Sequence, residues 1–126
     1  ALLGVRYLPT LILSFLITDL FIGFHGVTLF TWGSVILIGL CTKFFLTSKL
    51  SRIMGVLTGA SIFFVITNFG VWSLGSYGYT VEGFLICYTL ALPFFGNTLV
   101  STLIFSCVIE IILDRKVLLK KILITR

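Results

Sequence analysis

The chain has 126 residues, of which 59% are hydrophobic and only 10% are charged, and its mean hydropathy is +1.23. Ordinary soluble domains carry about 25% charged residues, so this composition excludes a soluble enzyme. The net charge of +5 does not indicate nucleic-acid binding, because the basic residues gather in one linker and in the C-terminal tail. The sequence therefore predicts an all-α integral membrane protein.

Two long segments, residues 53–81 and 83–109, contain no charged residue at all. Each exceeds the ~20 residues that an α-helix needs to cross the hydrocarbon core of a bilayer. The strand alternation with polar lumen residues that marks a membrane β-barrel is absent, and continuous Leu, Ile, Phe and Val stretches favour helices.

The first predicted helix runs from about Leu8 to Ile22, with Pro9 at its tolerated first turn. Residues 1–5 resemble the end of a helix and carry neither an initiator Met nor a signal peptide, so we expect a chain that is processed or that lacks its own N-terminus. A glycine-rich turn around His25 leads into a second helix at about 27–46.

A basic linker containing Lys43, Lys49 and Arg52 separates this helix from a third one at about 53–72. Gly55 and Gly59 form a GxxxG motif, which permits close contact between helices. After a loop at 73–80, a short apolar segment at 82–92 ends at Pro93. A fourth full helix is predicted at about 97–113, followed by a basic tail at 114–126.

The distribution of positive charge decides how the short segment 82–92 is interpreted. If it were a full span, the fourth helix would place the basic tail on the side opposite the basic linker, against the positive-inside rule. A re-entrant or interfacial segment instead places Arg6, the linker and the tail together. We expect these to face the cytoplasm, matrix or stroma, in a bacterial inner membrane or an organelle inner membrane.

Two polar residues lie near the first turn. An intramembrane carboxylate such as Asp19 is a functional hypothesis by default, and binding a ligand and bonding a neighbouring helix are both open. His25, alone in a glycine-rich turn, is interpreted as an interfacial hydrogen-bond donor rather than a metal ligand.

A second polar group is predicted where the later helices reach the outer face. This outer cluster consists of Thr67, Asn68, Trp72, Tyr77, Tyr79, Glu82, Asn97 and Thr98. Such a composition is typical of a small-molecule pocket. It is equally typical of an aromatic belt at the lipid headgroups.

The last helix carries a polar residue at every fourth position, a spacing that predicts a ridge facing protein rather than lipid. This ridge consists of Thr98, Thr102, Ser106, Glu110 and Asp114. Cys41, Cys87 and Cys107 lack metal-ligand spacing and are interpreted as small buried hydrophobic residues. Since no catalytic triad, phosphate-binding loop or zinc cluster is present, the sequence predicts no enzyme and no metal site.

Four stretches carry a family resemblance: I-T-D-L-F-I-G-F-H, T-N-F-G-V-W, L-I-C-Y and P-F-F-G-N-T-L. From Leu8 to about Cys107 the chain resembles a family of small, uncharacterised bacterial membrane proteins. That family is similar to the S components of energy-coupling factor transporters in helix order and in the P-F then Asn turn before the last helix. S components bind vitamins at the outer ends of six helices.

The resemblance implies a ligand position, and it also implies that this chain could not dock the coupling subunit in the usual way. It places six residues near the ligand: Thr67, Asn68, Trp72, Glu82, Tyr88 and Asn97. Four spans instead of six suggest an N-terminally truncated bundle, without the small-residue first helix that docks the coupling subunit.

Two functions follow as hypotheses. The first is a non-catalytic, vitamin-like small-molecule-binding subunit of a transporter. The alternative is an accessory subunit of a larger respiratory or photosynthetic membrane complex, with no ligand of its own. Both imply the lipid bilayer and other membrane subunits as partners, and neither identifies a cofactor.

Overall fold

The computed structural model describes residues 7–45 and 47–124, with side chains up to residue 115. The predicted helix end at residues 1–5, Arg6 and the last two residues of the basic tail lie outside this part. The described elements are α1 (Leu8–Ile22), α2 (Thr28–Cys41), the short 3-10 helix η2 (Thr42–Phe45), α3 (Lys49–Ser73) and α4 (Val81–Ile124). The all-α class is therefore confirmed for the described residues.

Three stretches are long and apolar enough to cross a membrane: Thr28–Phe45, Lys49–Ser73 and Val81–Arg115. The fourth apolar helix, α1, has only 15 residues, which corresponds to about 22 Å at 1.5 Å per residue. This is shorter than the hydrocarbon core of about 30 Å. The structure thus has three long spans and one short apolar helix where four full spans were predicted.

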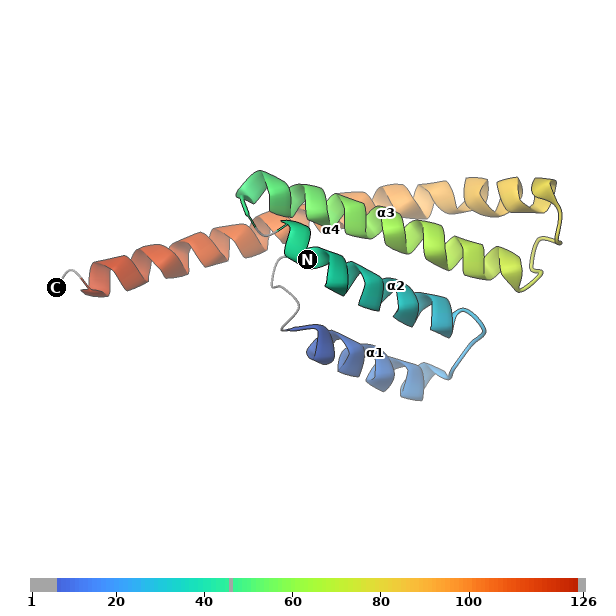
Figure 1. Cartoon of the computed structure of the whole chain (residues 1–126), viewed down its shortest axis with the longest axis horizontal. Helices are drawn as coiled ribbons and strands as arrows, with labels where there is room; N and C mark the ends of the chain where they lie inside the picture. Colours follow the sequence, from blue (N-terminus) through green and yellow to red (C-terminus); the bar gives the residue numbers. More distant parts are fainter. Residues whose placement is uncertain (1–6, 46, 125–126) are drawn as a thin grey trace.

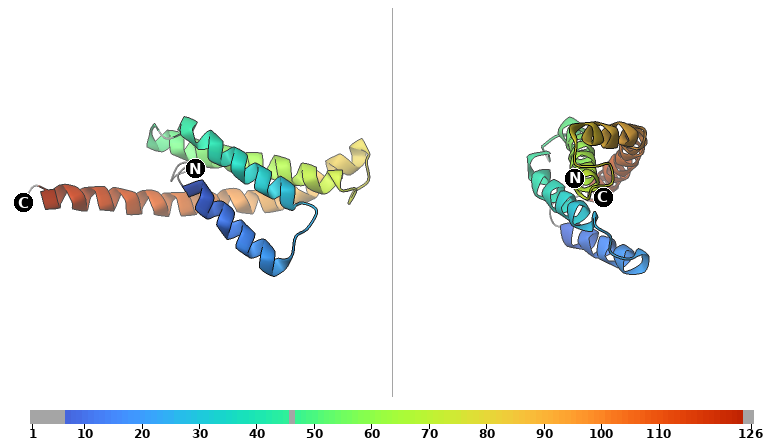
Figure 2. Two further views of the ribbon diagram at one scale, coloured as in Figure 1. Left: turned by 60° about the horizontal axis from the view of Figure 1, so that its bottom comes forward. Right: turned by 90° about the vertical axis from the view of Figure 1, so that its right-hand side faces the viewer.

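The helices pack in sequence order, α1 on α2, α2 on α3 and α3 on α4 (Figure 1). Viewed along the long axis they form a curved row with α1 and α4 at its two ends, and these two helices do not pack along each other (Figure 2). The row therefore has a concave side, and the C-terminal part of α4 extends past the other helices.

The predicted break at Pro93 is wrong. The segment 82–92 is the first part of α4, which continues through Pro93 without interruption. Proline removes one backbone hydrogen bond and disfavours a helix interior, but membrane helices tolerate it where neighbouring helices hold the chain. Here Tyr88 and Phe95, on either side of Pro93, both contact the ring of Phe64 on α3, at centroid distances of 5.7 and 4.4 Å. Packing against α3 thus keeps the two halves of α4 in line.

The predicted start of the third helix and the predicted tail are also corrected. Helix α3 begins at Lys49 because the Ser48 hydroxyl caps it, accepting a hydrogen bond of 3.1 Å from the Ser51 amide. The tail predicted at 114–126 is the end of α4, which is helical up to Ile124.

Ion pairs join the start of α3 to α4. Arg52 makes two parallel hydrogen bonds to the Glu110 carboxylate, of 2.5 Å from Nε and 2.8 Å from Nη2, and Lys49 pairs with Asp114 at 2.5 Å. These contacts, with the burial of Ser106, show that the C-terminal part of the predicted polar ridge faces α3, whereas Thr98 at its start is exposed. They also place the basic linker at the same end of the molecule as the charged part of α4.

Close contact at the GxxxG motif is confirmed. Gly55 and Gly59 are buried, and a Cβ atom on them would meet Phe45 at 2.5 Å and Ile38 at 3.1 Å. The absence of side chains on α3 thus lets α2 and η2 approach its backbone.

Candidate functional site

The two polar residues near the first turn make local contacts. Asp19 is only 8% exposed and accepts a hydrogen bond of 2.7 Å from the Trp32 indole on α2, so it ties α1 to α2. The exposed His25 lies 2.9 Å through Nδ1 from the Thr28 hydroxyl, at the start of α2. Of the two interpretations of Asp19, the structure shows the bond to a neighbouring helix.

Three of the six residues that the resemblance places near a ligand donate a side-chain hydrogen bond to a backbone carbonyl. Thr67 donates to the carbonyl of Phe63 at 2.8 Å and Asn68 to that of Phe64 at 2.8 Å, both within α3. The Tyr88 hydroxyl donates to the carbonyl of Val65 at 2.7 Å, across the α3–α4 interface. Only the Tyr88 bond joins α3 to α4, and each of the three side chains has one hydrogen bond satisfied within the protein.

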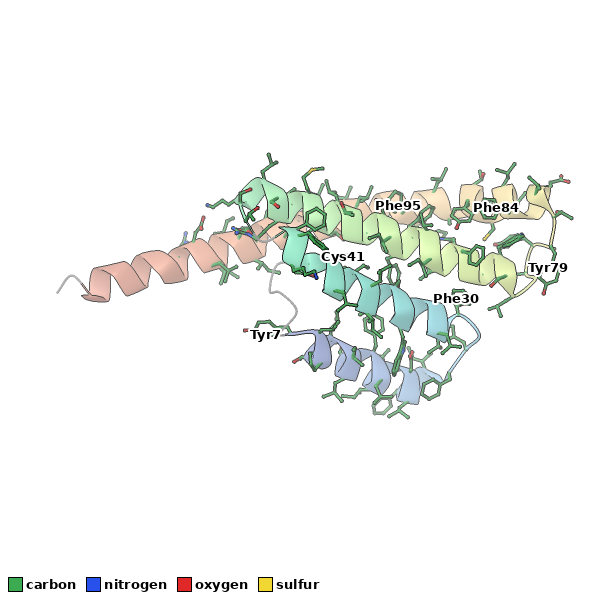
Figure 3. The ribbon with its side chains drawn as sticks, viewed as in Figure 1. Tyr7, Phe30, Cys41, Tyr79, Phe84 and Phe95 are labelled. Atoms are coloured by element: carbon green, nitrogen blue, oxygen red, sulfur yellow. The ribbon has the colours of Figure 1, made fainter. Side chains whose placement is uncertain are left out.

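Trp72 and Tyr88 meet in an aromatic cluster between α3 and α4. The ring of Phe84 lies 5.4 Å from that of Trp72 and 4.5 Å from that of Tyr88 (Figure 3). The Trp72 indole nitrogen is buried and has no hydrogen-bond partner in the described part of the chain. The three rings of this cluster do not line the cavity described below.

Glu82 and Asn97 do not join this cluster, because both side chains are exposed. They are 15 positions apart on α4, about 22 Å along the helix. The six residues therefore do not converge on one pocket. Trp72 and Tyr88 both pack on Phe84, the Asn68 carbonyl lies 3.5 Å from the Cys87 thiol, Thr67 bonds within α3, and Glu82 and Asn97 are exposed and far apart.

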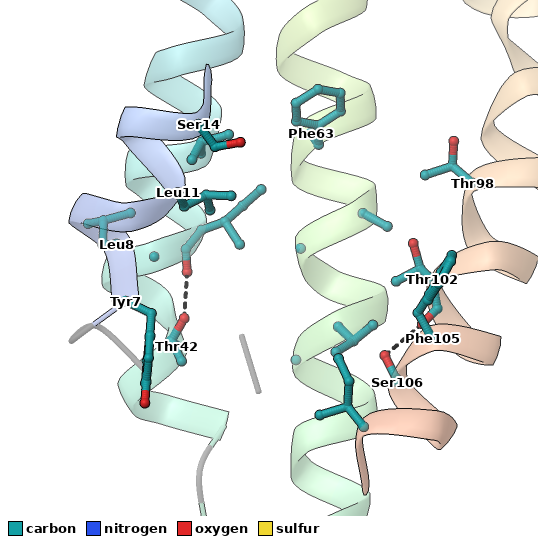
Figure 4. A pocket seen from close by; sticks show the side chains of 18 of the residues that line it. Tyr7, Leu8, Leu11, Ser14, Thr42, Phe63, Thr98, Thr102, Phe105 and Ser106 are labelled. Atoms are coloured by element: carbon teal, nitrogen blue, oxygen red, sulfur yellow. Dashed lines mark hydrogen bonds between the residues drawn. The ribbon is translucent and has the colours of Figure 1, made fainter. Parts of the chain in front are cut away.

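A cavity of about 690 Å³ lies elsewhere, on the concave side of the helix row (Figure 4). It is open to the outside, and Phe105 in its wall is 67% exposed. It lies between residues of α1, the C-terminal half of α2, the N-terminal half of α3 and the middle of α4, toward the end that carries the ion pairs. Its hydroxyl-bearing lining residues are Tyr7, Thr10, Ser14, Thr42, Thr98, Ser101, Thr102 and Ser106.

The remaining lining is apolar or small, including Leu11, Phe63, Phe105, Gly59 and Ala60. Among the described residues, no acidic, basic or histidine side chain lines this cavity. An apolar wall with a few hydroxyl groups is the chemistry of a site for a small molecule. Among the described residues it provides no carboxylate, imidazole, amine or thiol.

Several hydroxyl groups of the lining already donate a hydrogen bond to a backbone carbonyl. Thr98 donates to the carbonyl of Phe94 at 2.9 Å, Ser106 to that of Thr102 at 2.6 Å and Thr42 to that of Ile38 at 3.1 Å. Each of these oxygens keeps acceptor capacity. In Figure 4, Ser14 on α1 and Thr98 on α4 point toward the space between the helices.

Sequence reasoning missed this cavity although two of its signals were visible. The four-residue spacing of Thr98, Thr102 and Ser106 was interpreted as packing, as was the pair Gly55 and Gly59, and all five residues line the cavity. Of the predicted outer cluster, only Thr98 does so among the described residues. No pattern in the sequence indicates that these two stripes face each other across a space.

Side chains suited to metal binding or thiol chemistry are scattered. The described residues contain no group of three or more His, Cys, Asp or Glu side chains that could hold a metal ion. Cys87 is buried and Cys41 partly buried, but Cys107 is exposed, so the prediction of burial is wrong for Cys107. Cys107 directly follows Ser106 in α4, so its side chain points in another direction: Ser106 is buried and Cys107 is exposed.

One comparison with known proteins gives a match. A model of a family of unknown function, DUF6580, matches residues 5–115. This range contains α1, α2, α3, the membrane-spanning part of α4 and the whole cavity. No curated protein and no solved structure matches the chain. Since the match extends over most of its length, the chain belongs to the DUF6580 family of unknown function.

Proposed function

We propose that this chain is a non-catalytic, small-molecule-binding membrane subunit of a transporter, and that the cavity on the concave side holds the molecule. The observation that carries the proposal is the cavity itself, of about 690 Å³. Small-molecule sites occupy about 300–1,000 Å³ and combine apolar walls with a few polar groups. The resemblance to S components supports transport as the context. The site differs from the outer cluster, whose residues do not converge on one pocket and of which only Thr98 lines the cavity among the described residues.

Filling the cavity tests this function. Ala60 lines the cavity, whereas its neighbour Ser61 is exposed on the outside of α3. In mild detergent, native mass spectrometry of the wild-type protein should show a bound small molecule. Ala60→Phe should reduce its occupancy at least about tenfold, because a clash of only 1.4 kcal/mol has that effect. Ser61→Phe should retain it.

Equal loss of the molecule in the two variants would place the binding site outside the cavity. A wild-type protein that is empty but travels with other membrane subunits would overturn the transport proposal in favour of an accessory role.

One observation favours the accessory role as a second candidate. Asn97 is exposed near the middle of the Val81–Arg115 span, and an amide facing hydrocarbon without a partner costs free energy. A polar group of a neighbouring subunit would satisfy it. The same native mass spectra report such a subunit directly.

We also propose that the end carrying Lys49 faces the cytoplasm, matrix or stroma, because positive charge is retained on that side. In a background with the three native cysteines replaced by Ala, a membrane-impermeant maleimide added to intact cells or organelles should label Tyr77→Cys but not Lys49→Cys. After the membrane is opened, both should react. Labelling of both positions before opening would contradict this orientation.

A further inference from the structure

We propose that two copies of this chain associate in the membrane through a stripe of residues on α4, with Asn97 at its centre. The dimer is a property of α4 that does not depend on the proposed binding function. Its basis is the spacing of exposed residues on this helix, the chemistry of Asn97 and the orientation that copies share in one membrane.

The stripe is made of exposed residues whose spacing alternates between four and three positions. It extends over about 32 Å at 1.5 Å per residue, close to the thickness of the hydrocarbon core. Core positions of two-stranded coiled coils repeat with the same alternation, which keeps one face of each helix toward its partner. The stripe consists of Leu90, Phe94, Asn97, Ser101, Ile104, Val108 and Ile111.

The described part of the chain leaves this stripe uncovered. Helix α4 lies at one end of the helix row (Figure 2), and Phe95 contacts Phe64 on α3. Asn97 follows two positions later and therefore lies on roughly the opposite side of the helix, since one turn takes about 3.6 residues. The five large hydrophobic side chains of the stripe are 47–74% exposed.

Asn97 indicates what covers the stripe. Its amide makes no hydrogen bond with the described residues, whereas the amide of Asn68 donates to a carbonyl of its own helix. Asn97 lies near the middle of the Val81–Arg115 span, where water does not replace the missing partner. An amide has both donors and an acceptor, so it is complementary to a second amide.

A second copy supplies that amide at the right depth. Copies with the same orientation in one membrane have parallel α4 helices, and a two-fold axis along the membrane normal relates their stripes. The two Asn97 side chains then meet at one level, with the apolar residues of the stripe packed above and below them. In coiled coils a single asparagine among apolar core residues can fix the register of two helices in this way.

Energy transfer between labelled copies in liposomes tests the dimer. In the background with the three native cysteines replaced by Ala, Tyr77→Cys carries a donor or an acceptor dye, and the protein-to-lipid ratio is varied. Asn97→Leu should weaken association about three- to thirtyfold, the effect of one hydrogen bond between membrane helices. Asn97→Gln keeps the amide and should retain most of the association. Thr98→Val is the matched control, because Thr98 already donates to its own helix, and should associate like the parent.

Oxidation of single cysteines in native membranes identifies the contacting face. In the same background without the dye site, Phe94→Cys should form a disulfide-linked dimer at least about tenfold faster than Leu92→Cys, since thiols on faces that point apart cannot be bridged. Both native side chains are exposed, at 74% and 54%. They are two positions apart and lie at nearly the same depth, but only Phe94 belongs to the stripe.

Four results would overturn the proposal. The first is energy transfer in the parent no greater than that of randomly distributed monomers. The second is equal association of the parent and Asn97→Leu, and the third is equal linking of Phe94→Cys and Leu92→Cys. The fourth is a Phe94→Cys adduct whose mass is not twice that of the chain, which would identify a different membrane protein as the partner. Ligand occupancy in Ala60→Phe is measured separately, so the binding function and the dimer can fail independently.

Discussion

Replacing Glu110 with Ala is expected to lower the free energy of unfolding more than replacing Asp114 does, because Arg52 would lose both hydrogen bonds to its carboxylate partner. The side chains of Arg52 and Glu110 are only 23% and 12% exposed, so the remaining guanidinium would lose its partner where water cannot fully replace it. Reversible unfolding by SDS in mixed micelles measures this change.

Asp114 gives the matched control on the same helix. In its pair with Lys49 the two side chains are 50% and 63% exposed, and exposed pairs contribute at most about 1 kcal/mol. Asp114→Ala should therefore lower the free energy of unfolding less than Glu110→Ala does. Exchanging the charges, with Arg52→Glu and Glu110→Arg together, should recover most of the lost stability. Equal losses for Glu110→Ala and Asp114→Ala would contradict a special role of the partly buried pair.

Gly83→Ala is expected to destabilise the protein by about 2–3 kcal/mol, the upper part of the range for overpacking. Gly83 is buried in the first turn of α4, and a Cβ atom there would collide with the backbone carbonyls of Tyr77 and Gly78 in the preceding loop. Backbone atoms cannot rotate away as a side-chain end can. The Thr80 hydroxyl also caps the helix by accepting a 3.0 Å hydrogen bond from the Gly83 amide, so a shift would disturb the helix start.

The control lies further along α4. A Cβ atom on Gly96 meets nothing within 4 Å, so Gly96→Ala should be neutral or should stabilise the helix by up to about 1 kcal/mol. Thermal unfolding in detergent, followed by circular dichroism, compares the two variants. A Gly83→Ala protein that melts with the wild type would show that the loop before α4 does not contact it closely.

Helix positions were largely predictable because local signals mark them. Predicted bounds at 8–22 and 27–46 agree closely with α1 and with α2 plus η2, since Pro9 and the glycine-rich turn act within a few residues. The predicted break at Pro93 was wrong because it, too, used only a local signal. The local preference of proline ends helices, but contacts of Tyr88 and Phe95 with one ring on α3 outweigh it, and such contacts between helices are invisible in a linear pattern.

The candidate site was predictable only in fragments. The four-residue spacing of Thr98, Thr102 and Ser106 predicts that they share a face of a helix, because helical geometry is periodic. It does not say which helix that face meets. For the outer cluster, the sequence predicted proximity that the structure does not show. Glu82 and Asn97, expected at one membrane face, lie about 22 Å apart along α4.

The sequence by itself determined that this protein is suited to a lipid environment and that its basic residues gather at one end. Uncharged runs longer than a bilayer require helices in lipid, and the basic linker and the charged part of the last helix belong to one end. Only the tertiary structure decided that α4 is a single helix, that Asp19 bonds Trp32 and that the four helices curve around a cavity. The physical reason is that helix formation depends on neighbours three or four residues apart, whereas a cavity depends on the curvature of the whole row.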